Sequence, residues 1–556
     1  MTSSSTIDSN AATAPRPYDA VIVGAGIAGI GTLRRLRDDG YSVVVLEAGG
    51  GVGGTWYWNR YPGACCDSAS EVYSFSFSEE LLQSWSWKTR YPTQPQVLEY
   101  LEFVSDHFDL NRHIEFGKRV ASAVYDDQAR NWHITTEAGE VFVTKYFVTA
   151  VGNLSQPLVP QLDGLADFAG EVYYTSRWPH TPVDLAGKRV AVVGTGSSGI
   201  QVIPAIAGDV QTLTVFQRTA NYAIPARNHP LTAEDEAKIK PQYSEIREQA
   251  RWTPTGNLYE PDPQSALEVE EEERRQRYEA DWSVGGFQLL FGGYHDLGMD
   301  EDANRTVAEF VKNKIASIVE DPVTREKLTP KDHPIGTKRP PLDESYFAVF
   351  NRDNVHLVDL RSEPIERVTE TGIRTADTDY PLDVIVFATG FDAVTGSLNK
   401  IDIRGVGGTR LKEVWEAGPR TYLGLVSAGF PNLFMITGPQ SPSVMSTVTI
   451  SIEQHIEFLG ELLTYARAHR VETIDATVEA QNAWVAEIQD LIAGSLMAKY
   501  DSWYLGSNVP GKPRTILTYA GGVGTYRTRL AEIRAADYAG FVFTRSTDLV
   551  DAGGTP

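Results

Sequence analysis

Two glycine-rich hexapeptides, GAGIAG and GTGSSG, have the spacing of a loop that binds a dinucleotide. Their spaced glycines are Gly24, Gly26 and Gly29 in the first hexapeptide and Gly194, Gly196 and Gly199 in the second. The first glycine of such a loop permits a tight turn, the second lets the backbone approach a pyrophosphate, and the third lets helix pack on strand. The N-terminus of the following helix favours the anion. The sequence therefore predicts two dinucleotide sites.

The residues at the end of each following strand predict which dinucleotide binds where. Glu47 ends the strand after the first hexapeptide, and its carboxylate can accept a hydrogen bond from a ribose hydroxyl. At the corresponding position after the second hexapeptide stands Gln217, followed by Arg218 and Thr219. An arginine can bind a ribose 2′-phosphate, which a carboxylate would repel. The second site is therefore predicted to prefer NADP.

Two dinucleotide sites in one chain indicate two cofactors that exchange electrons. The site near the N-terminus is expected to hold FAD. The second site, with Ser197 and Ser198 in its loop, is expected to hold the NADPH that reduces the flavin. This combination is typical of flavoprotein oxidoreductases.

The cysteines argue against one class of flavoprotein. A disulfide reductase needs a redox pair such as CxxC beside the flavin, whereas the chain has two cysteines only, the adjacent Cys65 and Cys66. A bond between such neighbours is geometrically poor, so no structural disulfide is expected. A non-catalytic NADPH-binding redox sensor and an oxygen-activating monooxygenase remain as alternatives.

The elements that position the two loops repeat a strand–helix–strand pattern. It runs from Tyr18 to Ala48 and returns from Lys188, and apolar strands resume around NVHLVDL and DVIVFATG. The segment NWHITTEAGEVFVTKYFVTAVG predicts a hairpin that leads into a further strand. The predicted fold class is α/β, with two Rossmann-like dinucleotide-binding domains, one for FAD and one for NADP.

A length of 556 residues predicts more than one domain. The predicted division is a disordered tail (1–17), a discontinuous FAD-binding domain (18–150 and 386–556), an NADP-binding domain (151–228 and 331–385) and a helical insertion (229–330). The insertion is charged and poor in strand signals. Within it, Ser265 and Glu268 have the spacing of a capping box, which predicts a helix beginning there.

The charge and composition exclude several partners and locations. A formal net charge of −23 argues against nucleic acid and anionic membrane as partners. No apolar run approaches the roughly 18 residues of a membrane-spanning helix. The first residues lack the basic start and apolar run of a signal peptide. With so few cysteines, a reducing cytoplasm is the expected location, and no metal site is expected.

Several longer motifs carry a resemblance to a known family. GGTWYWNRYPGACCD, from Gly53 to Asp67, matches every fixed position of a signature of Baeyer–Villiger monooxygenases. FAGEVYYTSRWP lies where that family has the fingerprint Phe-x-Gly-x-x-x-His-x-x-x-Trp. FATG resembles the motif that links the flavin and NADP halves. GTGSSGIQ, AGPRTYLGL and SWYLGSNVPGKPR are similar to the phenylacetone and steroid monooxygenase branch. The resemblance spans about 18–543.

The resemblance implies an NADPH- and O2-dependent oxidation of ketones, aryl, cyclic or steroid-like, to esters or lactones through an FAD peroxide anion. By similarity, Arg339 in GTKRPP stabilises this anion, and Asp67 holds the arginine in place. A permanent cation suits the role, because arginine does not lose its proton at working pH. An N- or S-hydroxylating flavin monooxygenase is the alternative, which is expected to lack the Asp67–Arg339 pair.

The resemblance also assigns cofactor-binding and substrate-lining residues. Expected to contact the cofactors are Gly54, Thr55, Trp56, Asp67, Lys338 and Trp503, with Lys338 joining Arg218 and Thr219 at the 2′-phosphate. Expected to line the substrate site are Ser443, Val444, Met445 and Ser446. Next to Arg339, the pair Pro340–Pro341 departs from the relatives and predicts a stiffer loop, because proline fixes φ. The implied partners are a ketone and O2, and a monomer or weak oligomer is expected.

One fingerprint position departs from the family pattern. Phe168, Gly170 and Trp178 match, but Tyr174 stands where the family has histidine. Tyrosine can make one hydrogen bond, as a neutral imidazole can, but it cannot become a cation near neutral pH. If the histidine acts by structural hydrogen bonding, Tyr174 can replace it. If it acts by titrating, the rate or its pH dependence should differ.

Overall fold

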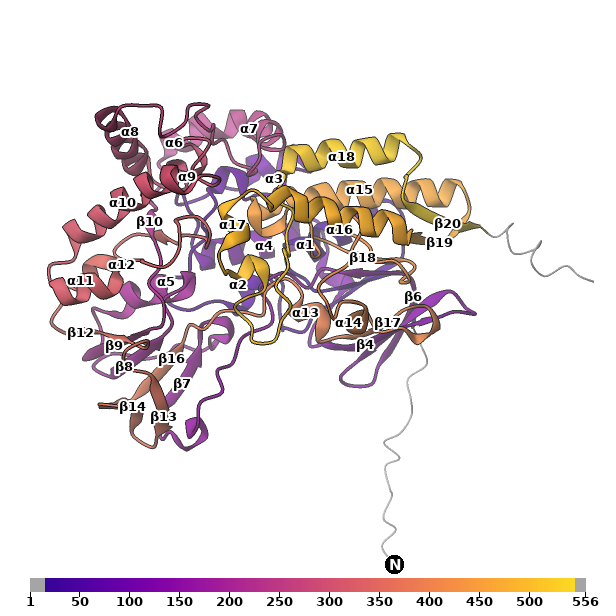
Figure 1. Cartoon of the computed structure of the whole chain (residues 1–556). Helices are drawn as coiled ribbons and strands as arrows, with labels where there is room; N and C mark the ends of the chain where they lie inside the picture. The colour runs from indigo at the N-terminus through magenta and orange to yellow at the C-terminus, as the bar shows by residue number, and fades with distance from the viewer. Residues whose placement is uncertain (1–15, 546–556) are drawn as a thin grey trace, which may run out of the picture.

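The computed structural model describes residues 16–545 and is organised around two larger β-sheets (Figure 1). The mixed α/β architecture with two Rossmann-like units confirms the predicted fold class. Residues 1–15 of the predicted tail lie outside the described residues. Its last two residues, Arg16 and Pro17, instead begin a strand, because they pair with Phe142 and Val143. The expected boundary at residue 17 was therefore wrong at this end.

The first sheet contains the first glycine loop and is mainly parallel. Its strands, in order, are β17 (Asp402–Arg404), β4 (Val120–Asp126), β5 (Asn131–Thr136), β6 (Val141–Thr149), β1 (Arg16–Val23), β2 (Val43–Leu46) and β3 (Ile114–Glu115), with β18 (Leu433–Met435) paired to β6. The predicted hairpin is β5 and β6, which pair antiparallel. Strands from the N-terminal part of the chain and from residues beyond 400 share this sheet. The division into domains stays a prediction.

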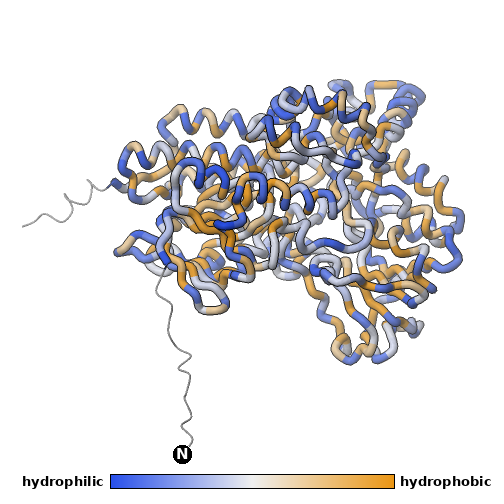
Figure 2. Tube along the Cα trace, turned by 180° about the vertical axis from the view of Figure 1, so that it is seen from behind, coloured by the Kyte–Doolittle hydropathy of each residue, from blue (hydrophilic) through white to orange (hydrophobic). Residues whose placement is uncertain are grey.

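The second sheet contains the second glycine loop and is entirely parallel. Its strands, in order, are β12 (Val355–Asp359), β9 (Thr212–Gln217), β8 (Arg189–Val193), β16 (Val384–Phe387) and β7 (Glu171–Tyr174). Since β16 belongs to this sheet, the predicted domain boundary after residue 385 cuts through a strand. Figure 2 shows that the coiled segments at the outside of the molecule alternate between hydrophobic and hydrophilic residues.

Each glycine loop connects a buried strand to a helix. Helix α1 (Ile27–Asp38) follows β1, and helix α5 (Ser197–Ile206) follows β8. Val21 and Ile22 of β1 are fully buried, because a parallel strand covered on both faces is apolar along its length. Gly24 and Gly194 then adopt φ of +104° and +111°, which L side chains rarely adopt.

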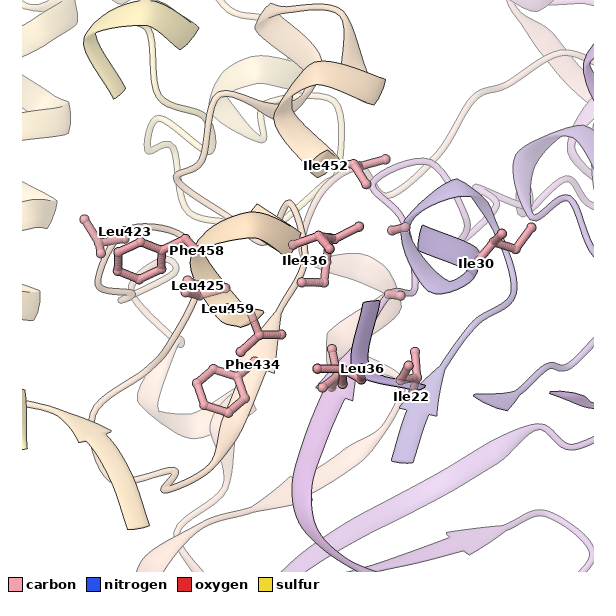
Figure 3. Close-up of a cluster of buried hydrophobic side chains, with 14 of the residues drawn as sticks. Ile22, Ile30, Leu36, Leu423, Leu425, Phe434, Ile436, Ile452, Phe458 and Leu459 are labelled. Carbon is pink, nitrogen blue, oxygen red and sulfur yellow. The ribbon is translucent and has the colours of Figure 1, made fainter. Parts of the chain in front are cut away.

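The C-terminal part of the chain packs against α1. Ile30 and Leu36 of α1 are buried in one hydrophobic cluster with Ile436 and with Leu459 of α15 (Val448–Ala468), and Figure 3 shows all four. Burying a side chain of this size stabilises by about 1.5–3 kcal/mol. The cluster holds the first glycine loop and the C-terminal helices as one unit.

The region predicted as a helical insertion does consist mainly of helices. They are α6 (Ala233–Ile239), α7 (Tyr243–Ala250), α8 (Glu271–Val284), α9 (Gln288–Phe291), α10 (Glu301–Ile318) and α11 (Pro322–Leu328). The predicted capping box was wrong, because α8 begins at Glu271 and not after Ser265. The Ser265 hydroxyl donates to Asp296 at 2.5 Å instead of capping a helix. The same hydroxyl accepts from the N–H of Leu267 at 3.1 Å, so its local bond forms a turn and not a helix cap.

A buried ion pair joins the insertion to the C-terminal helices. Arg247 of α7 contacts Glu453 of α15 at 2.7 Å, with side chains 2% and 5% exposed. Ser76 also donates to Glu453, through its N–H and its hydroxyl. Buried charges are tolerated when they are paired and hydrogen-bonded in this way.

The remaining elements are short or cover the sheets. They are α2 (Thr55–Trp58), α3 (Glu79–Ser84), α4 (Gln94–His107), α12 (Tyr346–Val349), α13 (Gly396–Asn399), α14 (Leu411–Val414), α16 (Val478–Ile492), α17 (Leu496–Lys499), α18 (Val523–Ala535), β10 (Ile224–Pro225), β11 (Leu342–Asp343), β13 (Ile365–Thr369), β14 (Gly372–Thr375), β15 (Asp379–Pro381), β19 (Val471–Ala476) and β20 (Phe541–Arg545). Within residues 16–545, no helix is both long and apolar enough to cross a bilayer.

Folding stability is expected to fall between about pH 6.5 and pH 4 because of one buried histidine. His455 of α15 accepts from the N–H of Thr437 at 3.1 Å, and its Nε2 lies 2.7 Å from the Tyr526 hydroxyl. Burial lowers the pKa of His455 from 6.5 to about 4. The folded state therefore binds this proton less readily than the unfolded state, and protonation of the unfolded chain favours unfolding by up to about 3 kcal/mol.

Urea unfolding at pH 7.5 and pH 5 measures this effect, with the variant His455→Gln as the reference. The free energy of unfolding of the wild type should fall more steeply than that of the variant, since other groups titrate alike in both. Equal pH dependence in the two proteins would contradict the assignment.

Candidate active site

Both glycine loops open into the same cavity of about 1750 Å³. Gly24 and Gly26 line one part of it, Gly194 and Gly196 another, and Arg339 lies on its wall. A cavity of this size exceeds the roughly 300–1,000 Å³ typical of a single drug-sized ligand. One space can therefore take two dinucleotides and a substrate.

The third glycine of each loop lies where no side chain fits. A Cβ on Gly29 would stand 1.8 Å from the carbonyl oxygen of Gly24, and one on Gly199 would stand 2.2 Å from that of Gly194. These contacts are the close helix-to-strand packing that the spacing predicted. A Cβ on Gly196, by contrast, would meet no protein atom within 4 Å. The space beside this glycine is open to a ligand.

Substituting alanine at Gly196 is expected to weaken NADPH binding without loss of stability. The backbone there has φ of −79°, which alanine adopts readily, and the added methyl group would point into open space where a pyrophosphate fits. We expect the dissociation constant for NADPH to rise about tenfold or more, measured by fluorescence titration. Gly208→Ala, at an exposed glycine with equal room, is the matched control. Unchanged affinity in Gly196→Ala would contradict the placement of the pyrophosphate.

Glu47 is buried at the first loop and oriented by backbone amides. Its carboxylate accepts from the N–H of Ala25 at 2.7 Å and of Gly49 at 2.6 Å. A carboxylate has about four lone-pair positions, so it retains capacity for a ribose hydroxyl. This buried, oriented acceptor fits the predicted FAD site.

The signature segment that starts at Gly53 lies between the two loops. Gly54, Thr55 and Trp56 all line the cavity, and the Trp56 indole donates to the Tyr73 hydroxyl at 3.1 Å. Further along, a Cβ on Gly63 would stand 2.4 Å from the carbonyl oxygen of Gln201 in α5. The segment thus packs directly on the helix of the second loop.

The two cysteines do not form a redox pair. Cys65 and Cys66 are both free. Burial raises the pKa of the Cys65 thiol to about 12 and that of Cys66 well above its usual value. Both are therefore thiols at neutral pH, which are poor nucleophiles. This is a physical argument against disulfide reduction.

Arg339 and Asp67 form the predicted pair. The Nε of Arg339 donates to Asp67 at 2.8 Å, and its Nη1 donates to the carbonyl oxygen of Val444 at 3.1 Å. The guanidinium also lies 4.8 Å from the ring centre of Phe287. Burial opposes the charge, but Asp67 and Tyr504 outweigh it and raise the pKa of Arg339. The site therefore holds a permanent cation on the cavity wall.

Cationic side chains gather where a 2′-phosphate is predicted. Arg218, Thr219 and Lys338 all line the cavity, and Arg361 donates to the Thr219 hydroxyl at 3.3 Å. Burial lowers the pKa of Lys338; Asp332 opposes this, while the nearby charges of Arg361 and Arg218 lower it further. An anion bound among these cations would relieve their mutual repulsion.

The residues predicted to line the substrate site separate into two groups. Val444 and Ser446 line the cavity, as does Trp503. Ser443 is fully buried, and Met445 packs against the main hydrophobic cluster. The side chains alternate because Ser443–Met445 is a single helical turn, which points successive residues in different directions.

The fingerprint stretch FAGEVYYTSRWP contacts both the signature segment and the second sheet. Trp178 is buried in the same hydrophobic cluster as Tyr61 of the signature segment, and Arg177 stacks on the ring of Trp58 at 4.5 Å. Tyr174, at the end of β7, stacks on Phe387 of β16 with ring centres 5.3 Å apart. Phe168 packs in that same part of the core, and a Cβ on Gly170 would stand 2.4 Å from the carbonyl oxygen of Asp383.

Sequence reasoning missed three side chains that shape the site. Gln201 accepts from the Tyr61 hydroxyl at 2.7 Å and donates to the carbonyl oxygen of Cys65 at 3.0 Å. Asn221 donates to the carbonyl oxygen of Arg339, and Phe287 lies beside the Arg339 guanidinium. Asn221 follows Arg218 closely in the chain, which was the only available signal. Phe287 gave none, since its partner is distant in sequence.

The chain matches known proteins over nearly its whole length. The family model described as pyridine nucleotide-disulphide oxidoreductase matches residues 21–274. A Baeyer–Villiger monooxygenase of Pseudooceanicola batsensis is 40% identical over 544 residues, covering 97% of this chain and 99% of the relative. The phenazine N-monooxygenase PhzNO1 of Lysobacter antibioticus is also 40% identical, over 94% of this chain and 97% of the relative.

Solved structures agree with these matches. Oxidized steroid monooxygenase bound to NADP has a TM-score of 0.91 and 48% identity, covering 96% of this chain and all of that chain. OTEMO in complex with FAD and NADP has a TM-score of 0.92 and 38% identity over the same share of each chain. With identities near 40% sustained over the full fold, the chain belongs to the Baeyer–Villiger monooxygenase family.

Proposed function

We propose that the protein is an FAD-containing, NADPH-dependent Baeyer–Villiger monooxygenase that uses O2 to convert ketones to esters or lactones. Its substrates are aryl, cyclic or steroid-like ketones. The observation that carries the proposal is the Arg339–Asp67 pair on the wall of one cavity that both glycine loops share. The solved structure of steroid monooxygenase holds NADP, and that of OTEMO holds FAD and NADP.

The residues divide the work between binding and charge. When bound and reduced by NADPH, the flavin supplies the activated oxygen of the reaction. The residues that would hold FAD are Gly24, Gly26, Gly29, Glu47, Gly54, Thr55, Trp56 and Asp67. Those that would hold NADP are Gly194, Gly196, Ser197, Ser198, Gly199, Arg218, Thr219, Lys338 and Trp503. Arg339 places a permanent positive charge where oxygen anions develop. Val444 and Ser446 would contact the ketone.

A ketone panel tests the proposal. The purified protein should be yellow, its NADPH oxidation should accelerate when a ketone is added, and gas chromatography should detect the ester. NADPH consumption that yields only hydrogen peroxide with every ketone would contradict it.

We further propose that the protein is cytoplasmic and that it is a monomer or a weak oligomer.

A second candidate is oxidation at nitrogen or sulfur. The 40% identity to a phenazine N-monooxygenase favours it, whereas the Asp67–Arg339 pair, which this candidate is expected to lack, is present and argues against it. Aromatic nitrogen heterocycles and thioethers in the same panel separate the two activities. A heterocycle N-oxide formed without any ester would favour this candidate, whereas a non-catalytic redox sensor would turn over none of the compounds.

A further inference from the structure

The segment that ends in Lys338 and Arg339 is hydrogen-bonded to the buried carboxamide of Asn304, which belongs to helix α10. Asn304 of α10 is 2% exposed and donates to the carbonyl oxygens of Leu297 at 2.7 Å and Ile335 at 2.8 Å. Its own oxygen accepts from the N–H of Ile335 at 3.1 Å. One side chain thus satisfies both backbone groups of Ile335. We refer to residues 333–339 as the arginine segment.

A second carboxamide holds the other end of the arginine segment. Asn221 donates through Nδ2 to the carbonyl oxygen of Arg339 at 3.3 Å, and its Oδ1 lies 3.1 Å from Nε2 of His333. A backbone carbonyl only accepts hydrogen bonds, so Nδ2 must face Arg339 and Oδ1 must face His333. The Nε2 of His333 must then carry a proton and donate it. Asn221 therefore ties the first residue of the segment to the last.

His333 is itself held on its other side. Its side chain is 2% exposed, its Nδ1 lies 3.0 Å from the Asp332 carboxylate, and the Tyr222 ring packs edge-on against it. Asp332 in turn pairs with Arg361, which contacts the predicted phosphate site. Because Nε2 carries the proton toward Asn221, Nδ1 can donate to Asp332 only when the ring is doubly protonated. In the neutral form, the Asn221 contact and the packing against Tyr222 fix the ring.

We propose that Asn221 and His333 are positioning residues that set the location of Arg339 in the cavity. The guanidinium of Arg339 is held by Asp67 and by the Val444 carbonyl oxygen, and the Asn221 bond holds its backbone. A charge that stabilises a transition state must be in place before the reaction starts. Moving the charged side chain during the reaction would cost part of the free energy by which it lowers the barrier. The inference rests on the proposed role of Arg339 in ketone oxidation.

Two substitutions at His333 separate positioning from simple packing. Glutamine places its amide nitrogen near the position of Nε2 and can still donate to Asn221, whereas asparagine reaches only the position of Nδ1. We expect His333→Asn to lower the rate of ester formation about tenfold, with more hydrogen peroxide formed per NADPH. His333→Gln should stay within about twofold of the wild type, since it restores the donor. Asn221→Leu should match His333→Asn.

Hydrogen–deuterium exchange of the arginine segment gives a readout that needs no turnover. The backbone amides of residues 335–339 should exchange several-fold faster in His333→Asn and Asn221→Leu than in the wild type or His333→Gln. Asn354→Leu is the matched control, because Asn354 also donates to main-chain carbonyls, those of Ala207 and Val210, away from the cavity. It should leave both exchange in the segment and product partition unchanged.

The outcomes distinguish this inference from the proposed function. A wild type that forms no ester from any ketone would contradict the proposed function, while the exchange rates would still decide whether Asn221 and His333 hold the segment. Normal exchange and normal ester yield in both His333→Asn and Asn221→Leu would overturn the inference. So would equal behaviour of the glutamine and asparagine variants.

Discussion

Replacing Arg339 by alanine is expected to abolish ester formation while NADPH oxidation continues. The predicted NADPH contacts lie at Arg218, Thr219 and Lys338, so hydride donation to the flavin does not need the guanidinium. Oxygen transfer does need it, because the anionic oxygens would lose the permanent cation that Asp67 holds on the cavity wall. Removing one such charge from a preorganised site costs on the order of 10²–10³-fold in rate.

The measurement compares ester formation, by gas chromatography, with NADPH consumption. Loss of Arg339 is tolerable for folding, because the Asp67 side chain is 36% exposed and can be solvated. Arg305→Ala on α10 removes an exposed arginine with an i,i+3 partner and serves as the control. Ester formation by Arg339→Ala at the wild-type rate would remove the main support for the proposed function.

Arg218→Ala is expected to weaken the preference for NADPH over NADH. Arg218 is exposed, lines the cavity next to Thr219, and increases the positive potential at Lys338. Its loss removes charge-assisted hydrogen bonds worth about 1.5–3 kcal/mol, which corresponds to about 10–100-fold in kcat/KM for NADPH. NADH lacks the 2′-phosphate, so its kcat/KM should change by no more than about twofold.

NADH is therefore the matched control within the same variant, and Arg352→Ala controls for the loss of a surface arginine elsewhere. Steady-state NADPH and NADH oxidation, each with saturating ketone, give the two ratios. A parallel decrease with both coenzymes would show that Arg218 acts on the fold of the loop and not on the phosphate.

Tyr174 occupies the one fingerprint position at which the sequence departs from the family pattern. The resemblance singled it out as the one departure from the fingerprint, and it left open whether hydrogen bonding or titration matters there. In the fold, Tyr174 stacks on Phe387 at the edge of the second sheet, and burial raises its pKa. Packing of the uncharged Tyr174 ring on Phe387 therefore explains how a tyrosine fits at this position.

Local signals were predictable because their physical cause is local. The glycine loops, Glu47 and Arg218 belong to strand–helix–strand units whose geometry follows from a few consecutive residues. The capping box at Ser265 failed for the converse reason: the serine hydroxyl donates to Asp296, a partner distant in sequence that the local pattern does not contain.

The sequence by itself determined the two dinucleotide loops, the α/β class and, through the family resemblance, the pairing of Asp67 with Arg339. Only the tertiary structure decided how that arginine is held. The residues that hold its segment, Asn221, His333 and Asn304, belong to no motif of the sequence, and only Asn221 stands close to a predicted site residue. Their role depends on which buried donors and acceptors the fold brings within hydrogen-bond distance, and that is settled by packing of segments far apart in the chain.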